Sequence, residues 1–299
     1  MALAAGLGLL QACALPPPAE RTAAVVELAA ASGWTPQRLT AAAFDLHAFV
    51  PAAHEAHASE RLTIYLEGDG LAWLNPTTPA LSPTPLDPIG LRLAMAHTGG
   101  RVAYLGRPCQ YIQVDAVRGC HPRYWGSHRF APDVLDAMDQ AVQQIKQRLG
   151  AAELVLVGYS GGAALAALLA GRRSDVVAWV SVAGVLDTDA WTQSLGISAL
   201  HGSLNPAAFV PQRTAVPQWH FIGSEDRVVA PVVLQRFLDA QARLRLPGAA
   251  TPTVQQLPAF DHGCCWVQEW PRLSRLFSQP DTFRKPGQAP ANPVSDKNR

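Results

Sequence analysis

The segment Gly-Tyr-Ser-Gly-Gly at residues 158–162 constrains the fold of this chain more than any other. It follows the apolar run 154–157 and precedes an alanine-rich segment, 163–170, with helical character. A buried strand that turns into a helix through Gly-x-Ser-x-Gly is typical of a nucleophile elbow, where the serine has a strained backbone. The small neighbours let strand and helix pass closely. We therefore predict that the Ser160 hydroxyl projects from a sheet beside a helix N-terminus, which favours negative charge.

An acidic residue suited to orienting a base follows the elbow along the chain. The segment 218–223 is a predicted strand, and Asp226 lies in the loop directly after it. Loops at the carboxyl ends of strands are where ligand sites gather in open α/β sheets. Asp226 is our candidate for the acid, and Glu225, Asp187 and Asp189 remain alternatives, since a loop aspartate is often a turn former or helix cap.

A histidine occupies the third place in the same order. The segment 253–257 is a predicted last strand, and His262 lies in the loop that follows. In a Ser-His-Asp arrangement this imidazole would take the proton of Ser160, while Asp226 would hold its tautomer and stabilise the imidazolium. The other histidines of the chain precede the elbow or fall elsewhere in the pattern, so we assign the base to His262.

Acyl transfer also needs N–H donors aimed at the oxyanion that develops in the transition state. One donor is expected from Gly161, the residue after the nucleophile. The second is expected from the glycine-rich loop after the predicted strand 62–66, with Asp69 as first choice and Gly68 or Gly70 as alternatives. A hairpin turn is the competing interpretation of the Asp-Gly dipeptide. The proline-rich segment that follows lacks the pattern of a paired strand, which argues against a hairpin.

From about residue 44 to 276 the chain resembles an α/β-hydrolase of the serine esterase and lipase type. The resemblance depends on four segments in the family's order, at 67–70, 158–162, 223–226 and 261–263. It implies a mostly parallel eight-stranded sheet flanked by helices. The chain departs from the family at Glu67, where a histidine is common before the first oxyanion glycine. It is also similar to a group of bacterial lipoprotein-like hydrolases.

We predict from these residues an exported serine hydrolase that cleaves a carboxylic ester, with a small-molecule or lipid-like ester as substrate. The chemistry requires no cofactor. A peptidase or a polyester depolymerase would use the same three side chains. A non-catalytic binding protein is the alternative from a different class, because a fold does not guarantee an activity.

The chain divides by composition into four segments. We predict a catalytic domain over 44–278, in which strands alternate with helices in a rhythm that favours a parallel sheet. Within it, 186–216 is predicted to be a lid-like insertion, or else a surface excursion without catalytic duty. Residues 14–43 are predicted to be a helical lead-in, and the polar, proline-rich segment 279–299 a disordered tail.

The N-terminal residues 1–13 resemble a bacterial lipoprotein signal with Cys13 as the lipidated residue. Cleavage and lipidation would make the protein periplasmic or membrane-anchored through Cys13. An ordinary helical segment is the alternative, because no basic residue precedes Cys13, unlike in ordinary signal peptides. No apolar run approaches the roughly 20 residues needed to span a bilayer.

Four further cysteines are compatible with an oxidising compartment, namely Cys109, Cys120, Cys264 and Cys265. They allow three pairings. We expect a bridge from the 109–120 loop to the histidine loop, where it would hold the base in place. Zinc is the competing idea, but adjacent cysteines lack Cys-x-x-Cys spacing, so we predict no metal. The net charge of +1 and the lack of a basic run argue against a nucleic-acid partner.

Overall fold

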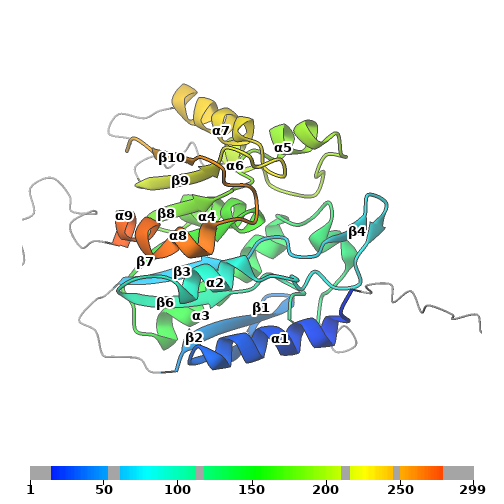
Figure 1. Cartoon of the computed structure of the whole chain (residues 1–299), viewed down its shortest axis with the longest axis vertical. Helices are drawn as coiled ribbons and strands as arrows, with labels where there is room; N and C mark the ends of the chain where they lie inside the picture. The colour runs from blue at the N-terminus through cyan, green and yellow to red at the C-terminus, as the bar shows by residue number, and fades with distance from the viewer. Residues whose placement is uncertain (1–14, 53–60, 112–117, 210–215, 245–249, 279–299) are drawn as a thin grey trace, which may run out of the picture.

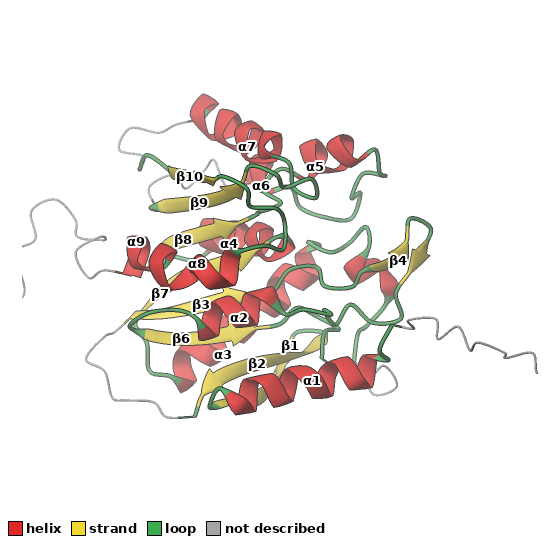
Figure 2. Ribbon diagram, viewed as in Figure 1, coloured by secondary structure: helices red, strands yellow, loops and turns green. Residues whose placement is uncertain are grey.

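The computed structural model describes residues 15–52, 61–111, 118–209, 216–244 and 250–278. Within these ranges the strands form one eight-stranded sheet and one two-stranded ribbon (Figure 1; Figure 2). The large sheet has the strand order β1-β2-β6-β3-β7-β8-β9-β10. Its strands are β1 (Trp34–Ala41), β2 (Phe44–Pro51), β3 (Arg61–Leu66), β6 (Arg101–Leu105), β7 (Glu153–Tyr159), β8 (Val176–Val182), β9 (Gln218–Gly223) and β10 (Thr253–Leu257).

The sheet is mostly parallel, as predicted. Strand β2 runs antiparallel to both of its neighbours, β1 and β6. The pairings from β6 through β3, β7, β8 and β9 to β10 are all parallel. The strands predicted at 44–50, 62–66, 100–105, 176–182, 218–223 and 253–257 are confirmed to within a residue or two. The carboxyl ends of the central strands therefore meet at one edge, where loops can gather around the end of β7.

Helices cover both faces of the sheet. One face is covered by α3 (Pro132–Arg148), α4 (Gly161–Arg172), α5 (Thr188–Leu195), α6 (Pro206–Phe209) and α7 (Pro231–Arg243). The other carries α1 (Pro18–Ala31), α2 (Ile89–Met95), α8 (Trp266–Leu273) and α9 (Arg275–Ser278). Strand β7 contributes Leu154 and Leu156 to the first core and Val155 and Val157 to the second. This alternation is that of a strand buried on both faces.

Helix α4 lies unusually close to the sheet. Residues 161–170 are all buried, and most of them are alanine or glycine. A Cβ added at Gly162 would lie 2.3 Å from the carbonyl oxygen of Leu66 and 2.5 Å from that of Glu67. A Cβ added at Gly158 would lie 2.3 Å from the carbonyl oxygen of Gly162. The two motif glycines are therefore required by the contact of the helix with the ends of β3 and β7.

The helical lead-in predicted over 14–43 is wrong in its second half. Helix α1 ends at Ala31, and Trp34–Ala41 forms β1, which pairs along its whole length with β2. Its polar composition and Pro36 concealed the strand. β1 is at the edge of the sheet, where a proline is tolerated. Only Trp34, Leu39 and Ala41 of its side chains are buried, so the strand lacks a regular apolar alternation.

The segment after the Gly68–Gly70 loop also differs from expectation. Strands β4 (Trp73–Asn75) and β5 (Thr78–Pro79) pair as a short hairpin. Its turn lies beyond Asn75, whose side-chain oxygen accepts the N–H groups of Thr77 and Thr78, and not at the Asp-Gly dipeptide. All residues of both strands are exposed, so no apolar alternation marked them in the sequence.

The cross-link predicted between the 109–120 loop and the histidine loop is wrong. Cys109 is bonded to Cys120, with their Cα atoms 5.6 Å apart, and Cys264 is bonded to Cys265. Gly119, beside Cys120, packs against the backbone at the start of β2, remote from the histidine loop beyond β10. A disulfide agrees with the predicted export, which stays a prediction. In the described ranges, no group of three or more His, Cys, Asp or Glu side chains could hold a metal ion.

The predicted insertion 186–216 contains α5 and α6 in its described part. Leu186 and Trp191 are buried in the core, and residues 197–200 line a cavity described below. Its lid-like role stays a prediction. The predicted signal, with Cys13, and the predicted tail 279–299 lie outside the described residues. Among the helices that the structure describes, none is long and apolar enough to cross a membrane.

Replacing Gly162 by alanine should destabilise the protein, because the new methyl group would meet backbone oxygens that cannot move away cheaply. We expect a loss near the upper end of the roughly 1–3 kcal/mol typical of overpacking. Gly171→Ala in the same helix is the matched control, since in the described part of the chain nothing outside the helix's own backbone lies within 4 Å of its added Cβ. That variant should gain about 0.5–1 kcal/mol from helix propensity. Urea unfolding of both variants measures the difference, and equal stabilities would contradict the proposed packing.

Candidate active site

Ser160 lies at the turn between β7 and α4. Its backbone has φ 51° and ψ −120°, a conformation that residues other than glycine rarely adopt. The backbone is held by neighbouring elements: the Ser160 N–H donates to Val182 at 2.9 Å, and the Ser160 carbonyl accepts from Val185 at 3.1 Å. The side chain is therefore directed outward at the carboxyl edge of the sheet, as the motif predicts.

The three side chains singled out from the sequence form one continuous hydrogen-bonded chain. The Oγ atom of Ser160 lies 3.1 Å from Nε2 of His262. The Nδ1 atom of His262 lies 2.8 Å from Oδ2 of Asp226. The imidazole is 19% exposed, whereas the Asp226 side chain is 1% exposed. Three residues far apart in the chain thus meet in the geometry that a nucleophile, a base and an orienting acid require.

Asp226 is fixed by its own loop. Its Oδ1 atom accepts the backbone N–H groups of Val228 at 2.9 Å and Val229 at 2.8 Å, which leaves Oδ2 for the imidazole. The alternatives lie elsewhere: Glu225 is exposed, and Asp187 caps the start of α5. The remaining candidate, Asp189, is in the first turn of α5 and contacts Asn205.

The histidine loop is held by two aromatic side chains that the sequence analysis missed. The hydroxyl of Tyr159 donates to the carbonyl oxygen of His262 at 2.8 Å, and Nε1 of Trp266 donates to the same oxygen at 3.0 Å. The Tyr159 ring also packs on the imidazole, with ring centres 5.3 Å apart. Burial raises the pKa of Tyr159 far above its ordinary value, so the hydroxyl remains a donor. The adjacency of Tyr159 to the nucleophile was the available signal.

The loop after β3 lies against the elbow. A Cβ added at Gly68 would lie 3.3 Å from Cβ of Ser160 and 3.1 Å from the Tyr159 ring. The N–H of Gly68 is already occupied, because it donates to Oε1 of Glu67 at 2.9 Å. Within the described ranges, no hydrogen bond engages the N–H of Asp69, Gly70 or Gly161. Gly68 is therefore the weakest of the predicted oxyanion donors, and Asp69 and Gly161 stay candidates.

Glu67 organises this loop from inside the protein. Its carboxylate is almost fully buried and accepts the N–H groups of Gly68, Gly90 and Leu91 and the hydroxyl of Tyr104. Burial raises the pKa of Glu67, while these four hydrogen bonds oppose the rise. Where the family commonly has a histidine, this chain thus has an acceptor that ties the loop to the start of α2.

The side chain of Asp69 forms a buried ionic cluster. Its two carboxylate oxygens pair with Nη1 of Arg107 and Nη1 of Arg129, and both arginine side chains are only 5% exposed. Burial alone would raise the pKa of Asp69, but the charges of Arg129 and Arg107 together hold it below its usual value. Composition alone did not reveal this cluster, because the two arginines lie far from Asp69 in sequence.

Comparison with known proteins identifies the fold of the chain but no related family or curated protein. No family model matches the chain, and no curated protein matches it. An esterase from Pyrococcus furiosus superposes with a TM-score of 0.55 at 12% identity, over 81% of this chain and 89% of that one. A putative α/β hydrolase from Agrobacterium tumefaciens gives 0.55 at 13% identity, over 84% and 100%. An acylaminoacyl peptidase from Pyrococcus horikoshii gives 0.57 at 11% identity, over 86% and 43%.

These three similarities cover between 81% and 86% of this chain. A puromycin hydrolase superposes with a TM-score of 0.55 at 18% identity, but this chain spans only 37% of its length. Identities this low carry the architecture and not the activity. The chain has the α/β-hydrolase fold, in agreement with the resemblance noted in its sequence.

Replacing Glu67 by glutamine should destabilise the protein. The amide NH₂ would replace one carboxylate oxygen, so an N–H or O–H donor that was bonded to that oxygen would lose its acceptor. A loss of about 1–3 kcal/mol is expected for an unsatisfied buried group. Glu269→Gln, at an exposed position in α8, should change stability by less than about 0.5 kcal/mol. Thermal unfolding from about pH 4 to about pH 8 measures both effects.

The pH dependence has a definite sign. The pKa of Glu67 is raised in the folded state, so its stabilising contribution is complete below the unfolded-state pKa and is lost as pH rises through the folded-state pKa. Glutamine does not titrate. The advantage of wild type over Glu67→Gln should therefore shrink as pH rises, and a constant or growing advantage would contradict the burial argument.

Proposed function

We propose that this protein is a serine hydrolase that cleaves a carboxylic ester through an acyl-enzyme. The observation that carries the proposal is the unbroken hydrogen-bonded chain from the Ser160 hydroxyl through His262 to Asp226. The 3.1 Å from Ser160 Oγ to Nε2 of His262 is within the range in which a base can accept the hydroxyl proton. The 2.8 Å from Nδ1 to Asp226 is within the range in which the acid can orient the base. The strained turn that presents Ser160 adds independent support.

In the proposed mechanism, Ser160 Oγ attacks the acyl carbon while Nε2 of His262 takes its proton. The same imidazolium then gives that proton to the leaving alkoxide, which leaves Ser160 acylated. Water, deprotonated by His262, attacks the acyl-enzyme, and the proton returns to Ser160 as the acid departs. Asp226 keeps Nδ1 protonated and stabilises the imidazolium, because its other oxygen is fixed by two backbone N–H groups.

The oxyanion would be held by the N–H groups of Gly161 and Asp69. Both amides lie beside the nucleophile without another hydrogen-bond acceptor in the described part of the chain, and Gly161 also begins α4. Preorganised donors of this kind are worth about 2.7–4 kcal/mol each in the transition state. Gly70 remains the alternative to Asp69.

An ester is proposed ahead of a peptide because of the surroundings of the site. A largely apolar cavity is lined in part by Arg129, which pairs with Asp69, and would suit a hydrocarbon part of a substrate. Peptide cleavage is the second candidate, since two of the structures named above are, by their names, an acylaminoacyl peptidase and a puromycin hydrolase. The three side chains would perform both reactions, so a substrate panel separates them.

Ser160→Ala should abolish both turnover of p-nitrophenyl esters and labelling by a fluorophosphonate probe, because among the described residues no other hydroxyl is paired with His262. The expected loss in kcat is about a millionfold or to background. Ser194→Ala, at an exposed position in α5, is the matched control and should be labelled like wild type. Wild type that neither turns over esters nor reacts with the probe would point to a binding protein instead.

Asp226→Asn should lower kcat by about ten-thousandfold while leaving the fold intact, because an amide cannot stabilise the imidazolium and favours the wrong tautomer. Glu225→Gln changes the neighbouring, exposed acid and should retain wild-type kcat. Steady-state kinetics on one p-nitrophenyl ester compares the two. Nearly unchanged activity in Asp226→Asn, or a large loss in Glu225→Gln, would reject Asp226 as the acid.

A further inference from the structure

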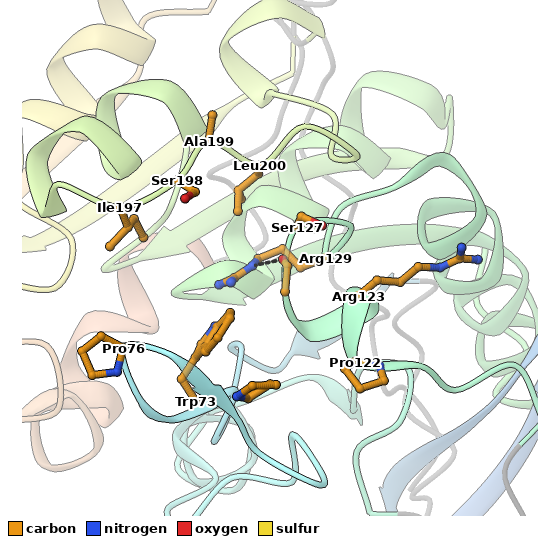
Figure 3. A pocket seen from close by; sticks show the side chains of 12 residues that line it. Trp73, Pro76, Pro122, Arg123, Ser127, Arg129, Ile197, Ser198, Ala199 and Leu200 are labelled. Carbon is orange, nitrogen blue, oxygen red and sulfur yellow. Dashed lines mark hydrogen bonds between the residues drawn. The ribbon is translucent and has the colours of Figure 1, made fainter.

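A cavity of about 430 Å³ lies between three segments of the chain (Figure 3). The β4–β5 hairpin, the stretch 122–129 and the stretch 197–200 form its walls. Most of the lining is apolar, and none of its described lining residues is acidic. The lining residues are Trp73, Pro76, Pro79, Pro122, Arg123, Gly126, Ser127, Arg129, Ile197, Ser198, Ala199 and Leu200. The cavity has the character of a binding site for a hydrocarbon group.

Arg129 places a buried positive charge in this apolar setting. Its side chain is 5% exposed, and Figure 3 shows the guanidinium pointing between Trp73 and Ile197. Nε donates to the carbonyl oxygen of Gly126 at 2.8 Å, and Nη1 pairs with Asp69. Among the described residues, Nη2 has no hydrogen-bond acceptor. The guanidinium therefore has N–H donors left for a ligand in the cavity.

Arg123 does not compete for that role. Its guanidinium points away from the other labelled side chains in Figure 3 and lies over the Tyr124 ring, 4.6 Å from the ring centre. Arg123 lines the cavity, but its charged group is engaged by Tyr124. Arg129 is thus the cation that the cavity presents.

Arg129 shares its ion-pair partner with a second arginine. Two guanidinium groups, of Arg107 and Arg129, contact the single carboxylate of Asp69. The Glu67 carboxylate, which also attracts Arg107 through its charge, accepts hydrogen bonds from three backbone N–H groups and the Tyr104 hydroxyl. Burying a charge is costly unless it is paired. A planar guanidinium with unused N–H groups matches a carboxylate, which it can bind through two parallel hydrogen bonds.

The cavity and the nucleophile are linked through Asp69. A Cβ added at Gly161, next to Ser160, would lie 2.1 Å from Oδ1 of Asp69, and Oδ2 of that carboxylate pairs with Arg129. One side chain therefore separates the elbow from the charged end of the cavity. The proposal below requires a substrate with its scissile carbonyl at Ser160 to extend past Asp69 into the cavity.

We propose that the cavity is a specificity site for substrates that carry a free carboxylate on an apolar chain, with Arg129 binding the carboxylate. The inference rests on the proposed serine hydrolase function and names the substrate class of that site: half-esters of dicarboxylic acids, or esters whose alcohol part bears a carboxylate. Binding through Arg129 acts on substrate recognition and leaves the bond-breaking steps to Ser160 and His262.

Paired substrates, one with a free carboxylate and the other with its methyl ester, test the proposal on the wild-type protein. On the acyl side, mono-4-nitrophenyl adipate is compared with methyl 4-nitrophenyl adipate. On the alcohol side, 4-butanoyloxybenzoate is compared with its methyl ester. We expect kcat/KM to be about ten- to hundredfold higher for the acid in at least one pair, which is the range for a hydrogen bond to a charged group. The difference should arise from a lower KM for the acid, with kcat similar for the two compounds. A preference for the neutral ester, or none, in both pairs overturns the inference, while the hydrolysis itself upholds the proposed function.

A pair of variants assigns the preference to Arg129. Arg129→Gln should reduce it to within about twofold, whereas Arg38→Gln, which removes one positive charge from the exposed edge of β1, should keep it. Retention of the preference in a folded Arg129→Gln protein overturns the assignment.

Equilibrium binding supplies a readout that needs neither catalysis nor a change at Arg129. Calorimetry on Ser160→Ala compares monomethyl adipate with dimethyl adipate. Binding of the acid at least about tenfold tighter supports recognition of the free carboxylate even if Arg129→Gln fails to fold, and separates that recognition from the proposed function if no ester is turned over. Equal affinity for the two compounds overturns it.

Discussion

The close contact between the start of α4 and the ends of β3 and β7 is the constraint on which the rest of the structure depends. At Gly158 and Gly162 no side chain fits between helix and strands, so the turn at Ser160 must be tight and its backbone strained. The same contact brings the carbonyl groups of Leu66 and Glu67 against the helix. The loop that follows β3 therefore begins beside the nucleophile, and one packing relation positions both the hydroxyl and the N–H groups around it.

The histidine and aspartate loops of the site are each held in place by hydrogen bonds from groups that take no part in the proposed reaction. Tyr159 and Trp266 hold the carbonyl oxygen of His262, and the backbone after Asp226 holds one oxygen of its carboxylate. Tyr159 immediately precedes Ser160, so the base is attached to the strand that carries the nucleophile. A shift of that strand would carry both groups together, which preserves their separation better than two independent loops could.

The sequence predicted the parts of this fold that follow from local pattern. The alternation of strands and helices, the elbow, and the loops that carry Asp226 and His262 are each marked by residues within a few positions of one another. What it could not predict depends on partners distant in sequence. Strand β1 has polar, proline-containing composition because it lies at an edge, and the β4–β5 hairpin is wholly exposed. The disulfide pairing required knowing that Gly119 packs on the start of β2. The burial of Arg107 and Arg129 around Asp69 has no local signature either.

Asp69 presents an electrostatic difficulty that its surroundings resolve. Its backbone N–H is a candidate oxyanion donor, yet its side chain carries the same sign of charge as the oxyanion. At an effective dielectric constant of about 20, two like charges roughly 4 Å apart repel by about 4 kcal/mol, as much as a good oxyanion donor contributes. Pairing with Arg107 and Arg129 balances the charge of the Asp69 carboxylate. An acidic residue is compatible with this loop because the two arginines pair with it, and one of them, Arg129, also lines the cavity.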